Sequence, residues 1–471
     1  MALTRTTGNS GGIFPTVADL QLAGLSVNNR AELSTGERYV VSATNTGDGI
    51  LLSNGNYANP IGLEGIRYDL INSPDLDLFA KNKVGVMLNG EFTNESTTEA
   101  KYTDVYGTIQ TATTDGTFRQ FRPESDGYRF EGTSTNEVLQ SELLQTSPWL
   151  FGVNNPTLLS GNNLAPDGTT TAEFYEDADV GLSRYNRQLV TGTYNGFVTS
   201  SAYFKAGTST VFGLRVALAG GTTRFTGTAF DSLTKTFLST PPTGITFDYE
   251  ELVDGWFRVI MIIDSTGLSN TSIDLRVYPT SQLAASQVGT AYIWGVQVEQ
   301  LPFATSYTPT TAAPVTRTAD ENSALYYANM PRGDQAFTIR FKGVIDGYTN
   351  TNRLFGAESG INEVKAIVNN DLSISLFNGS DSSRADTAPI IAGAVFDYVI
   401  TSDGTNYKSY LDGLFQNSST VNNPAIGITN ELRILRGVGA ANDAYGNCSI
   451  FQAWIGEALT AEEIKFISGG A

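Results

Sequence analysis

Three carboxylates just before a tryptophan are, by residue type, the side chains of this sequence best suited to acid–base chemistry. They are Glu250, Glu251 and Asp254, and Trp256 follows them. Retaining glycosidases hold two carboxyl groups about 5–5.5 Å apart, and inverting glycosidases hold them about 6.5–9.5 Å apart. Adjacent residues of a strand point to opposite faces of the sheet, so Glu250 and Glu251 cannot converge on one glycosidic bond. The sequence therefore predicts a solvated edge and turn here, and we expect the protein not to be an enzyme.

Other catalytic and metal-binding chemistries lack the residues that they need. The chain contains no histidine, which excludes a Ser-His-Asp triad, a Cys-His dyad and any His-ligated metal within it. The single cysteine, Cys448, excludes an intrachain disulfide and a cysteine-cluster metal site. Its strand-like flanks predict a small buried side chain rather than a reactive thiol. The Gly-rich residues 219–223 lack the lysine of a phosphate-binding loop.

Calcium is the one cofactor that the sequence leaves open. Residues 403–406 (Asp-Gly-Thr-Asn) and 346–350 (Asp-Gly-Tyr-Thr-Asn) have the composition of oxygen-rich loops. Plain β-turns are the favoured interpretation, because Asp, Asn and Gly are the common residues of turns. We expect no other cofactor and no metal site.

One polar stretch has the residue types for recognising a sugar. Tyr348, Asn350 and Asn352 alternate in Tyr-Thr-Asn-Thr-Asn, between two strand-like runs. An exposed aromatic ring can stack on a pyranose face while amide groups fix its hydroxyls. These three residues are the candidate carbohydrate-binding site, and an ordinary polar hairpin is the alternative.

Length and charge limit the choice of partner. At 471 residues the chain has room for about three domains. Its net charge of −19 opposes binding to nucleic acid, where neutralising Lys and Arg supply most of the affinity. No apolar run reaches the length of a signal peptide or of a membrane span, so we expect synthesis in a cytoplasm without export and no membrane insertion.

The elements that must position these residues are mainly β-strands. A small mixed region covers residues 1–125, with a helix expected at 16–23, a strand at 36–41 and a turn at 45–49. From residue 126 short apolar runs alternate with Gly, Asn and Pro breakers, which is typical of a β-sandwich or jelly roll. The expected strands after this point are 200–205, 256–263, 272–278, 337–341, 372–376, 398–401, 432–435 and 450–455.

Several residues between and inside these strands have structural roles. The Thr/Pro-rich stretch 305–314 predicts a linker or an extended strap. Trp256 and Trp294 lie in apolar strands and are expected core anchors, each burying roughly 150–250 Å². Arg258 and Glu299 are expected to form an ion pair. Thr460 with Glu463 has the spacing of a capping box and predicts a closing helix.

Six phrases, in a fixed order, resemble a known kind of domain. The phrases are Tyr-Arg-Phe-Glu-Gly at 128–132, Ala-Pro-Asp-Gly-Thr at 165–169, Ser-Ala-Tyr-Phe-Lys-Ala-Gly at 201–207, Asp-Gly-Trp-Phe-Arg-Val at 254–259, Tyr-Ile-Trp-Gly-Val-Gln-Val-Glu at 292–299 and Ala-Thr-Ser-Tyr-Thr-Pro-Thr at 304–310. With these phrases, residues 128–320 resemble a carbohydrate-binding-module-like jelly roll that is common in bacteriophage tail and fibre proteins.

The remaining parts of the chain carry weaker likenesses. Residues 321–471 resemble a laminin-G/concanavalin-A-like lectin sandwich, through the hairpin Tyr-Leu-Asp-Gly at 410–413 and the closing strand and helix at 450–464. Residues 14–20 (Phe-Pro-Thr-Val-Ala-Asp-Leu) are similar to head-proximal segments of phage tailspikes. The resemblances imply an N-terminal virion-attachment region at 1–125, a jelly roll at 126–320 and a β-sandwich at 321–471.

These resemblances imply a bacteriophage virion structural protein. Its expected role is that of a tail fibre or appendage subunit that binds host-surface glycans. The alternative is a capsid or collar decoration protein, or head fibre, whose sandwiches are structural spacers. Expected partners are other virion proteins, contacted through the N-terminal region, a host glycan, and two further copies in a homotrimer. The expected location is the virion, after synthesis in the host cytoplasm.

Overall fold

The computed structural model describes most of the chain after residue 127 and the strands before it. The described residues are 10–14, 30–33, 38–42, 50–51, 57–60, 76–77, 93–95, 100–104, 106–112, 119–120, 128–150, 154–281, 283, 287–325, 331, 336–348, 352–357, 364–378, 385–420, 431–435 and 444–469. The chain divides into two compact units, residues 1–73 with 459–471, and residues 74–458.

The described residues of the first unit form a five-stranded sheet and helix α4. The sheet order is β1-β2-β3-β5-β4, from β1 (Ser10–Phe14), β2 (Arg30–Leu33), β3 (Arg38–Ser42), β5 (Tyr57–Pro60) and β4 (Ile50–Leu51). The strand expected at 36–41 is confirmed as β3, whereas the expected helix at 16–23 and turn at 45–49 lie outside the described residues. Helix α4 (Ala461–Ile467) begins with the predicted capping box, in which Thr460 and Glu463 bond each other's backbone N–H groups.

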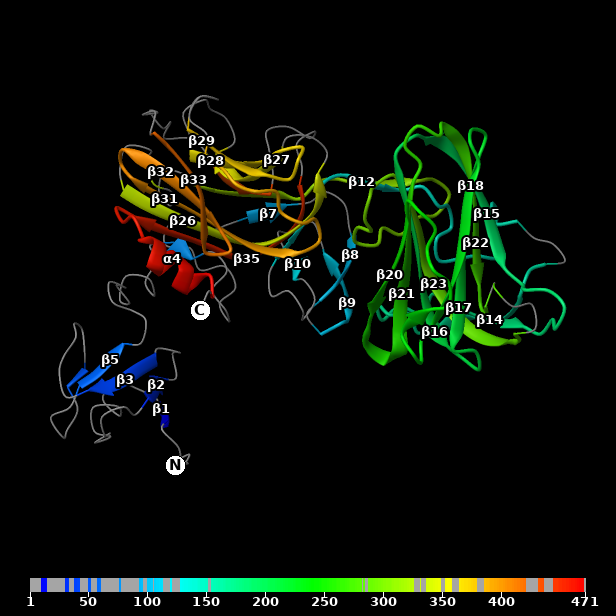
Figure 1. The fold of residues 1–471 in the computed structure, drawn as a ribbon. Coiled ribbons are helices and arrows are strands. Elements are labelled where there is room, and N and C mark those ends of the chain that lie inside the picture. Colours follow the sequence, from blue (N-terminus) through cyan, green and yellow to red (C-terminus); the bar gives the residue numbers. More distant parts are fainter. Residues whose placement is uncertain are drawn as a thin grey trace. The chain divides into compact units, whose positions relative to one another are not determined.

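The second unit contains a jelly roll made of two antiparallel sheets. One sheet has the order β13 (Thr157–Asn163), β14 (Ala172–Asp177), β23 (Gly289–Glu299), β16 (Phe197–Ala206), β21 (Trp256–Asp264) and β20 (Ile245–Glu251). The other has the order β15 (Asn186–Tyr194), β22 (Asn270–Tyr278), β17 (Val211–Ala219), β18 (Arg224–Asp231) and β19 (Thr236–Phe237). The two sheets face each other in Figure 1. The strands expected at 200–205, 256–263 and 272–278 are therefore confirmed.

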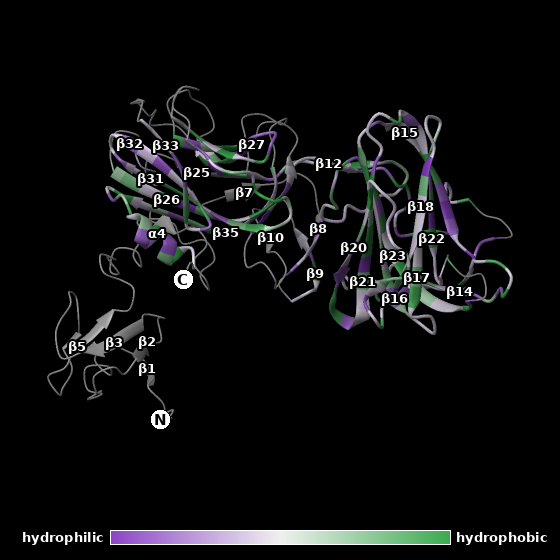
Figure 2. Ribbon diagram, viewed as in Figure 1, coloured by the Kyte–Doolittle hydropathy of each residue, from purple (hydrophilic) through white to green (hydrophobic). Residues whose placement is uncertain are grey.

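Apolar side chains on the facing sides of these sheets form the jelly-roll core. Phe204 of β16 stacks on Phe212 of β17, with ring centroids 5.2 Å apart and an interplanar angle of 5°. Both predicted core anchors, Trp256 and Trp294, are buried in a second cluster that also contains Tyr203 and Tyr307. Figure 2 shows hydrophobic and hydrophilic residues interspersed along the strands, as expected of sheets with one face in a core.

The same unit contains a second β-sandwich. Its eight-stranded sheet follows the order β10 (Arg119–Gln120), β11 (Tyr128–Phe130), β35 (Ala444–Ile455), β26 (Ala336–Tyr348), β31 (Val395–Asp403), β32 (Asn406–Leu411) and β33 (Leu414–Thr420), and β6 (Leu76–Asp77) also pairs with β35. The seven-stranded sheet follows the order β30 (Ala385–Asp386), β29 (Ile374–Asn378), β28 (Val364–Val368), β27 (Asn352–Ala357), β34 (Glu431–Ile434), β25 (Glu321–Leu325) and β7 (Thr93–Glu95).

The sequence correctly identified most strands of this second sandwich. The strands expected at 337–341, 398–401 and 450–455 are confirmed, while the one expected at 372–376 begins later, at Ile374. The hairpin at 410–413 joins β32 to β33 through Asp412 and Gly413, which have φ values of 51° and 76°. Two central residues with positive φ match the twist of the flanking strands. The predicted mainly β fold with two sandwiches is confirmed.

Short segments connect or complete these sandwiches. Strands β8 (Ala100–Thr103) and β9 (Ile109–Ala112) form a hairpin, and β12 (Ser134–Asn136) pairs with β24 (Val315–Arg317). The 3-10 turn η1 (Val253–Gly255) precedes β21, and Asp254 and Gly255 both have the positive φ expected of a tight turn. Of the stretch 305–314, predicted as a linker or an extended strap, residues 305–308 form a buried strap and residues 311–314 are exposed.

Three segments that the sequence assigned elsewhere pair with the second sandwich. Strand β11 pairs with β35 in the register Tyr128↔Cys448, although its residues belong to the jelly-roll phrases. Strand β6 also pairs with β35, and β7 pairs with β25. The predicted domain boundaries at 125/126 and 320/321 stay predictions. Among the residues described above, no helix has the length and apolar character needed to cross a membrane.

Candidate ligand-binding cavity

The predicted sugar loop joins the two sheets of the second sandwich. Tyr348 ends β26, where it is paired with Ala444, and Asn352 begins β27, where it is paired with Val368. Strands β26 and β27 belong to different sheets of the second sandwich. Asn350 lies outside the described residues, and the proposed sugar contact of the three residues stays a prediction.

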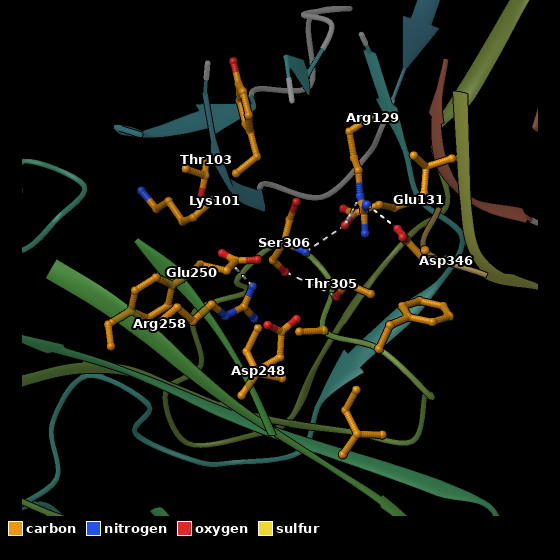
Figure 3. A pocket seen from close by; sticks show the side chains of 18 of the residues that line it. Lys101, Thr103, Arg129, Glu131, Asp248, Glu250, Arg258, Thr305, Ser306 and Asp346 are labelled. Atoms are coloured by element: carbon orange, nitrogen blue, oxygen red, sulfur yellow. Dashed lines mark hydrogen bonds and ion pairs between the residues drawn. The ribbon is translucent and has the colours of Figure 1, made fainter. Parts of the chain in front are cut away.

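A cavity of about 390 Å³ lies in the second unit, lined by both of its sandwiches (Figure 3). Its walls come from strands β8, β16, β20, β21, β26 and β31, from the buried strap with the residues just before it, and from the segment that begins with β11. The lining residues are Lys101, Tyr102, Thr103, Arg129, Glu131, Tyr203, Asp248, Glu250, Arg258, Ile260, Ile262, Phe303, Ala304, Thr305, Ser306, Val344, Asp346, Gly393 and Val395.

Two carboxylates on β20 line one wall of the cavity. Asp248 and Glu250 are two positions apart, so strand alternation places both on the cavity face. Tyr249 between them packs on the core side against Phe230, with ring centroids 4.7 Å apart. Glu251 follows the same alternation away from the cavity, and its carboxylate pairs with Lys235 at 2.7 Å on the exposed surface. The predicted divergence of Glu250 and Glu251 is therefore observed, and Asp248 is the acid that sequence reasoning missed.

Arg258 on β21 lies beside these acids and is buried. Its Nε and Nη2 donate hydrogen bonds to Ser201 Oγ at 3.2 and 3.0 Å. Its Nη1 lies 4.0 Å from Glu250 Oε2, and its guanidinium carbon lies 5.3 Å from the centre of the Tyr203 ring. In Figure 3 the guanidinium, Asp248 and Glu250 face one another at the centre of the cavity.

The ion pair expected between Arg258 and Glu299 is replaced by other contacts. Arg258 forms an ion pair with Glu250. Glu299 is buried, and its carboxylate accepts hydrogen bonds from the N–H and the hydroxyl of Thr305. Burial raises the pKa of Glu299, which hydrogen bonds from Thr305 and the charge of Arg258 partly offset. This contact positions Thr305 at the cavity wall.

Arg129 on β11 forms ion pairs with two carboxylates at the cavity wall. Its Nε lies 3.2 Å from Glu131 Oε1, and its Nη1 donates to the carboxylate of Asp346 on β26. Burial disfavours its charge, but Asp346 and Glu131 outweigh that effect and raise the pKa of Arg129. Asp346 therefore belongs to a strand and an ion pair, which corrects the expectation of an oxygen-rich loop beginning there.

Glu131 is the centre of a buried charge network next to the cavity. It accepts a hydrogen bond from Ser306 N at 2.8 Å, and its Oε2 lies 3.5 Å from Arg317 Nη2. Arg317 also lies 3.6 Å from Asp320 Oδ1, and Asp320 in turn accepts from the Glu131 N–H at 2.8 Å. These contacts fix the strap and the cavity wall in one arrangement.

Lys101 on β8 completes the set of lining cations. Its Nζ donates to Thr111 Oγ1 at 2.9 Å and lies 3.3 Å from Asp167 Oδ2. Its backbone exchanges two hydrogen bonds of 2.8 Å with Tyr307 of the strap. The lining side chains together comprise three cations, four carboxylates, hydroxyls and aromatic rings. Such a mixture can exchange hydrogen bonds with a polar organic ligand and contact its apolar faces.

Residues 403–406, one of the two predicted oxygen-rich loops, and the thiol of Cys448 both lie among the described residues. Residues 403–406 form a turn in which Asp403 Oδ1 accepts from Thr405 N and Asn406 N at 2.8 and 2.7 Å. Within the described ranges, no three His, Cys, Asp or Glu side chains are grouped to hold a metal ion. Cys448 is buried as predicted, and burial raises the pKa of its thiol well above the usual range.

No model of a protein family and none of the curated proteins matches this sequence. Comparison with solved structures finds partial matches among β-sandwich chains. A sialidase from Trypanosoma rangeli, in complex with 2,3-difluorosialic acid, matches with a TM-score of 0.25 and 19% identity over 29% of this chain and 23% of its own. Domain 4 of an extracellular arabinanase from Geobacillus stearothermophilus, in complex with arabinotriose, matches with a TM-score of 0.26 and 16% identity over 35% of this chain and 82% of its own.

A third match is the carbohydrate-binding module of a sialidase from Ruminococcus gnavus, bound to α2,6-sialyllactose. It has a TM-score of 0.25 and 13% identity, over 29% of this chain and 84% of its own. This chain thus spans less than a quarter of the Trypanosoma sialidase. Matches with TM-scores this low do not indicate a function for this chain.

Proposed function

We propose that this chain is a non-enzymatic protein that binds glycans, and that the cavity is its saccharide-binding site. The observation that carries the proposal is the convergence of Asp248, Glu250 and Arg258 in a cavity of about 390 Å³. Small-molecule pockets span about 300–1,000 Å³, and a few placed polar groups in them fix the ligand's orientation. Carboxylates accept hydrogen bonds from sugar hydroxyls, and guanidinium groups donate to ring and hydroxyl oxygens.

The proposal is tested with the full chain on a glycan array, followed by calorimetric titration of the glycans that bind. Glu250→Gln should weaken binding by about tenfold, because a charge-assisted hydrogen bond becomes a neutral one. The matched control is Glu251→Gln, which makes the same change one position along β20, where the side chain pairs with Lys235 outside the cavity. Equal affinities of the two variants, or no glycan bound by the wild type, would contradict the proposal.

Hydrolysis is the second candidate function. Asp248 and Glu250 share one strand face in the cavity, and two carboxylates flanking a bond are what glycosidases use. A hydrolase would release reducing ends from a bound polysaccharide, and Glu250→Gln would abolish that release. A non-enzymatic binder leaves the polysaccharide intact while retaining it.

For the setting in which binding occurs, we propose a bacteriophage virion, with this chain as a tail-fibre or appendage subunit made in the host cytoplasm. The support is the ordered set of phrases at 128–310 and the lectin-like hairpin at 410–413. In this proposal, residues 1–125 attach to other virion proteins and three copies assemble. Linking weak sites in a trimer would raise avidity by roughly 10²–10⁴-fold.

The rival setting is a capsid or collar decoration protein whose sandwiches are spacers. Electron microscopy of the virion with this chain labelled separates the two, since an appendage label lies on the tail and a decoration label on the head. Sedimentation of the purified chain measures its copy number. A sedimenting monomer would contradict the trimer.

Tyr348, Asn350 and Asn352 are proposed as a second sugar contact. Tyr348→Ala in the full chain tests this contact, because the cavity residues stay unchanged. An additive loss of affinity on top of Glu250→Gln would support two contacts, and an unchanged affinity would exclude this one.

A further inference from the structure

We infer that the saccharide held in the cavity is neutral or bears an amino group, and that carboxylated sugars are excluded. The inference rests on the proposed glycan binding and names the chemical class of the ligand. It follows from how the charged side chains that line the cavity are arranged.

The cations of the cavity are already engaged with partners from the chain itself. Arg129 is held between Glu131 and Asp346, and Lys101 lies 3.3 Å from Asp167 and donates to Thr111. To pair with either cation, a ligand carboxylate would have to displace the carboxylate of a protein side chain. That exchange gains no new ion pair and leaves a protein carboxylate displaced in a partly buried place.

Arg258 is engaged in the same way. Two of its nitrogens donate to Ser201 Oγ, its third lies 4.0 Å from Glu250, and its guanidinium stacks near the Tyr203 ring. Arginine recognises a carboxylate best through two parallel N–H donors. Since Ser201 accepts from Nε and Nη2, that edge of the guanidinium is directed at the protein, and Nη1 on its other edge lies beside the Glu250 carboxylate.

Two of the four acids that line the cavity, Asp248 and Glu250, stand together on one wall. Asp248 and Glu250 stand on one face of β20 and together present carboxylate oxygens, which accept hydrogen bonds and donate none when ionised. Sugar hydroxyls can donate to them, and an ammonium group would add charge assistance. A ligand carboxylate would face like charges at short range, in a chain whose net charge is already −19.

The test compares three β-1,4-linked tetrasaccharides of glucose, glucosamine and glucuronic acid, which share ring and linkage and differ in one substituent. They are titrated as competitors of the tightest array glycan, at a pH where the amine is protonated and the acid ionised. The glucosamine and glucose oligomers should compete at least about tenfold better than the glucuronic acid oligomer. The gap should shrink in the Asp248→Asn/Glu250→Gln double variant and remain in Glu251→Gln.

Each outcome separates this inference from the function on which it rests. If carboxylated array glycans bind as tightly as neutral ones, the inference is overturned and glycan binding stands. If no glycan binds, both are overturned. If the charge preference is unchanged in the Asp248→Asn/Glu250→Gln variant, the acidic wall does not set it and the inference is overturned at that wall.

Discussion

Removal of the Glu131 side chain should strongly lower the free energy of unfolding of the second unit. It faces two buried cations, Arg129 at 3.2 Å and Arg317 at 3.5 Å. Breaking a buried ion pair from one side leaves an uncompensated charge and typically costs about 3–5 kcal/mol. We expect Glu131→Ala to lower the free energy of unfolding of this unit by that amount, measured by denaturant titration. The control is Glu251→Ala at an exposed position, which should change the free energy of unfolding by less than about 0.5 kcal/mol. A similarly small change for Glu131→Ala would contradict a stabilising role of the buried charge network.

Asp274 links acid sensitivity to a specific pair of arginines. Burial opposes its charge, but hydrogen bonds from Arg276 and Arg187, both at 2.7 Å, outweigh burial and lower its pKa below the usual 3.8. A lowered folded-state pKa stabilises the protein above the unfolded-state pKa, and the effect is lost as the pH falls through the folded-state pKa. Asp274→Asn should therefore cost about 1 kcal/mol near neutrality and progressively less in acid. A difference that stays constant with pH would argue against this linkage.

Cys448 should not react while the protein is folded. It is buried, its thiol pKa is raised by burial, and its Sγ donates to the carbonyl of Ile450. Because the thiolate is the reactive form, an aromatic disulfide reagent should label the chain only after denaturant is added. Rapid labelling of the native protein would show that β35 opens locally.

At this scale the sequence predicted burial well and contacts poorly. Trp256, Trp294 and Cys448 were identified because apolar flanks predict burial whatever the partner is. The alternation Phe247-Asp248-Tyr249-Glu250 is the sequence signal that places Asp248 on the same strand face as Glu250. The partner of Arg258 could not be predicted, since it depends on which strands are neighbours in space.

Among the elements, the β32–β33 hairpin shows where local chemistry alone decides structure. Its two central residues both have positive φ. This conformation costs free energy for a residue with a Cβ atom, whereas glycine adopts it without that cost. Gly413→Ala should cost about 1–2 kcal/mol in unfolding free energy. Asp412→Asn is the matched control, because Asn tolerates this conformation and keeps an oxygen for the Asp397 N–H, which Asp412 Oδ1 accepts at 2.9 Å. Equal losses from both substitutions would mean that the turn conformation is not the cause.

Local patterns also explain why most strands and the α4 cap were predicted correctly, while strand partners were not. Alternation and turn residues are read within a few positions, and the capping box needs only Thr460 and Glu463. Nothing within the phrase at 128–132 indicates that β11 pairs with β35 and not with a jelly-roll strand. Sheet partners are set by the packing of the whole sandwich.

For the whole molecule, the contributions of β6, β7 and β11 predict that residues 321–471 are an incomplete sandwich. Strand β35 pairs with both β6 and β11, and β25 pairs with β7. A chain cut to 321–471 would expose these strand edges, and uncovered edges promote association. We expect it to elute as aggregates in size-exclusion chromatography, whereas residues 74–471 elute as a discrete species. A monodisperse, folded 321–471 fragment would disprove this.

The pairing of β11 with β35 determines when the cavity wall can form during synthesis of the chain. Arg129 on β11 and Asp346 on β26 meet at the cavity, and both strands lie directly against β35. Because β35 begins at Ala444, a growing polypeptide lacks the brace of this pocket until the ribosome has passed that residue. If the cavity binds saccharide as proposed, translation products that stop before residue 444 should not bind it.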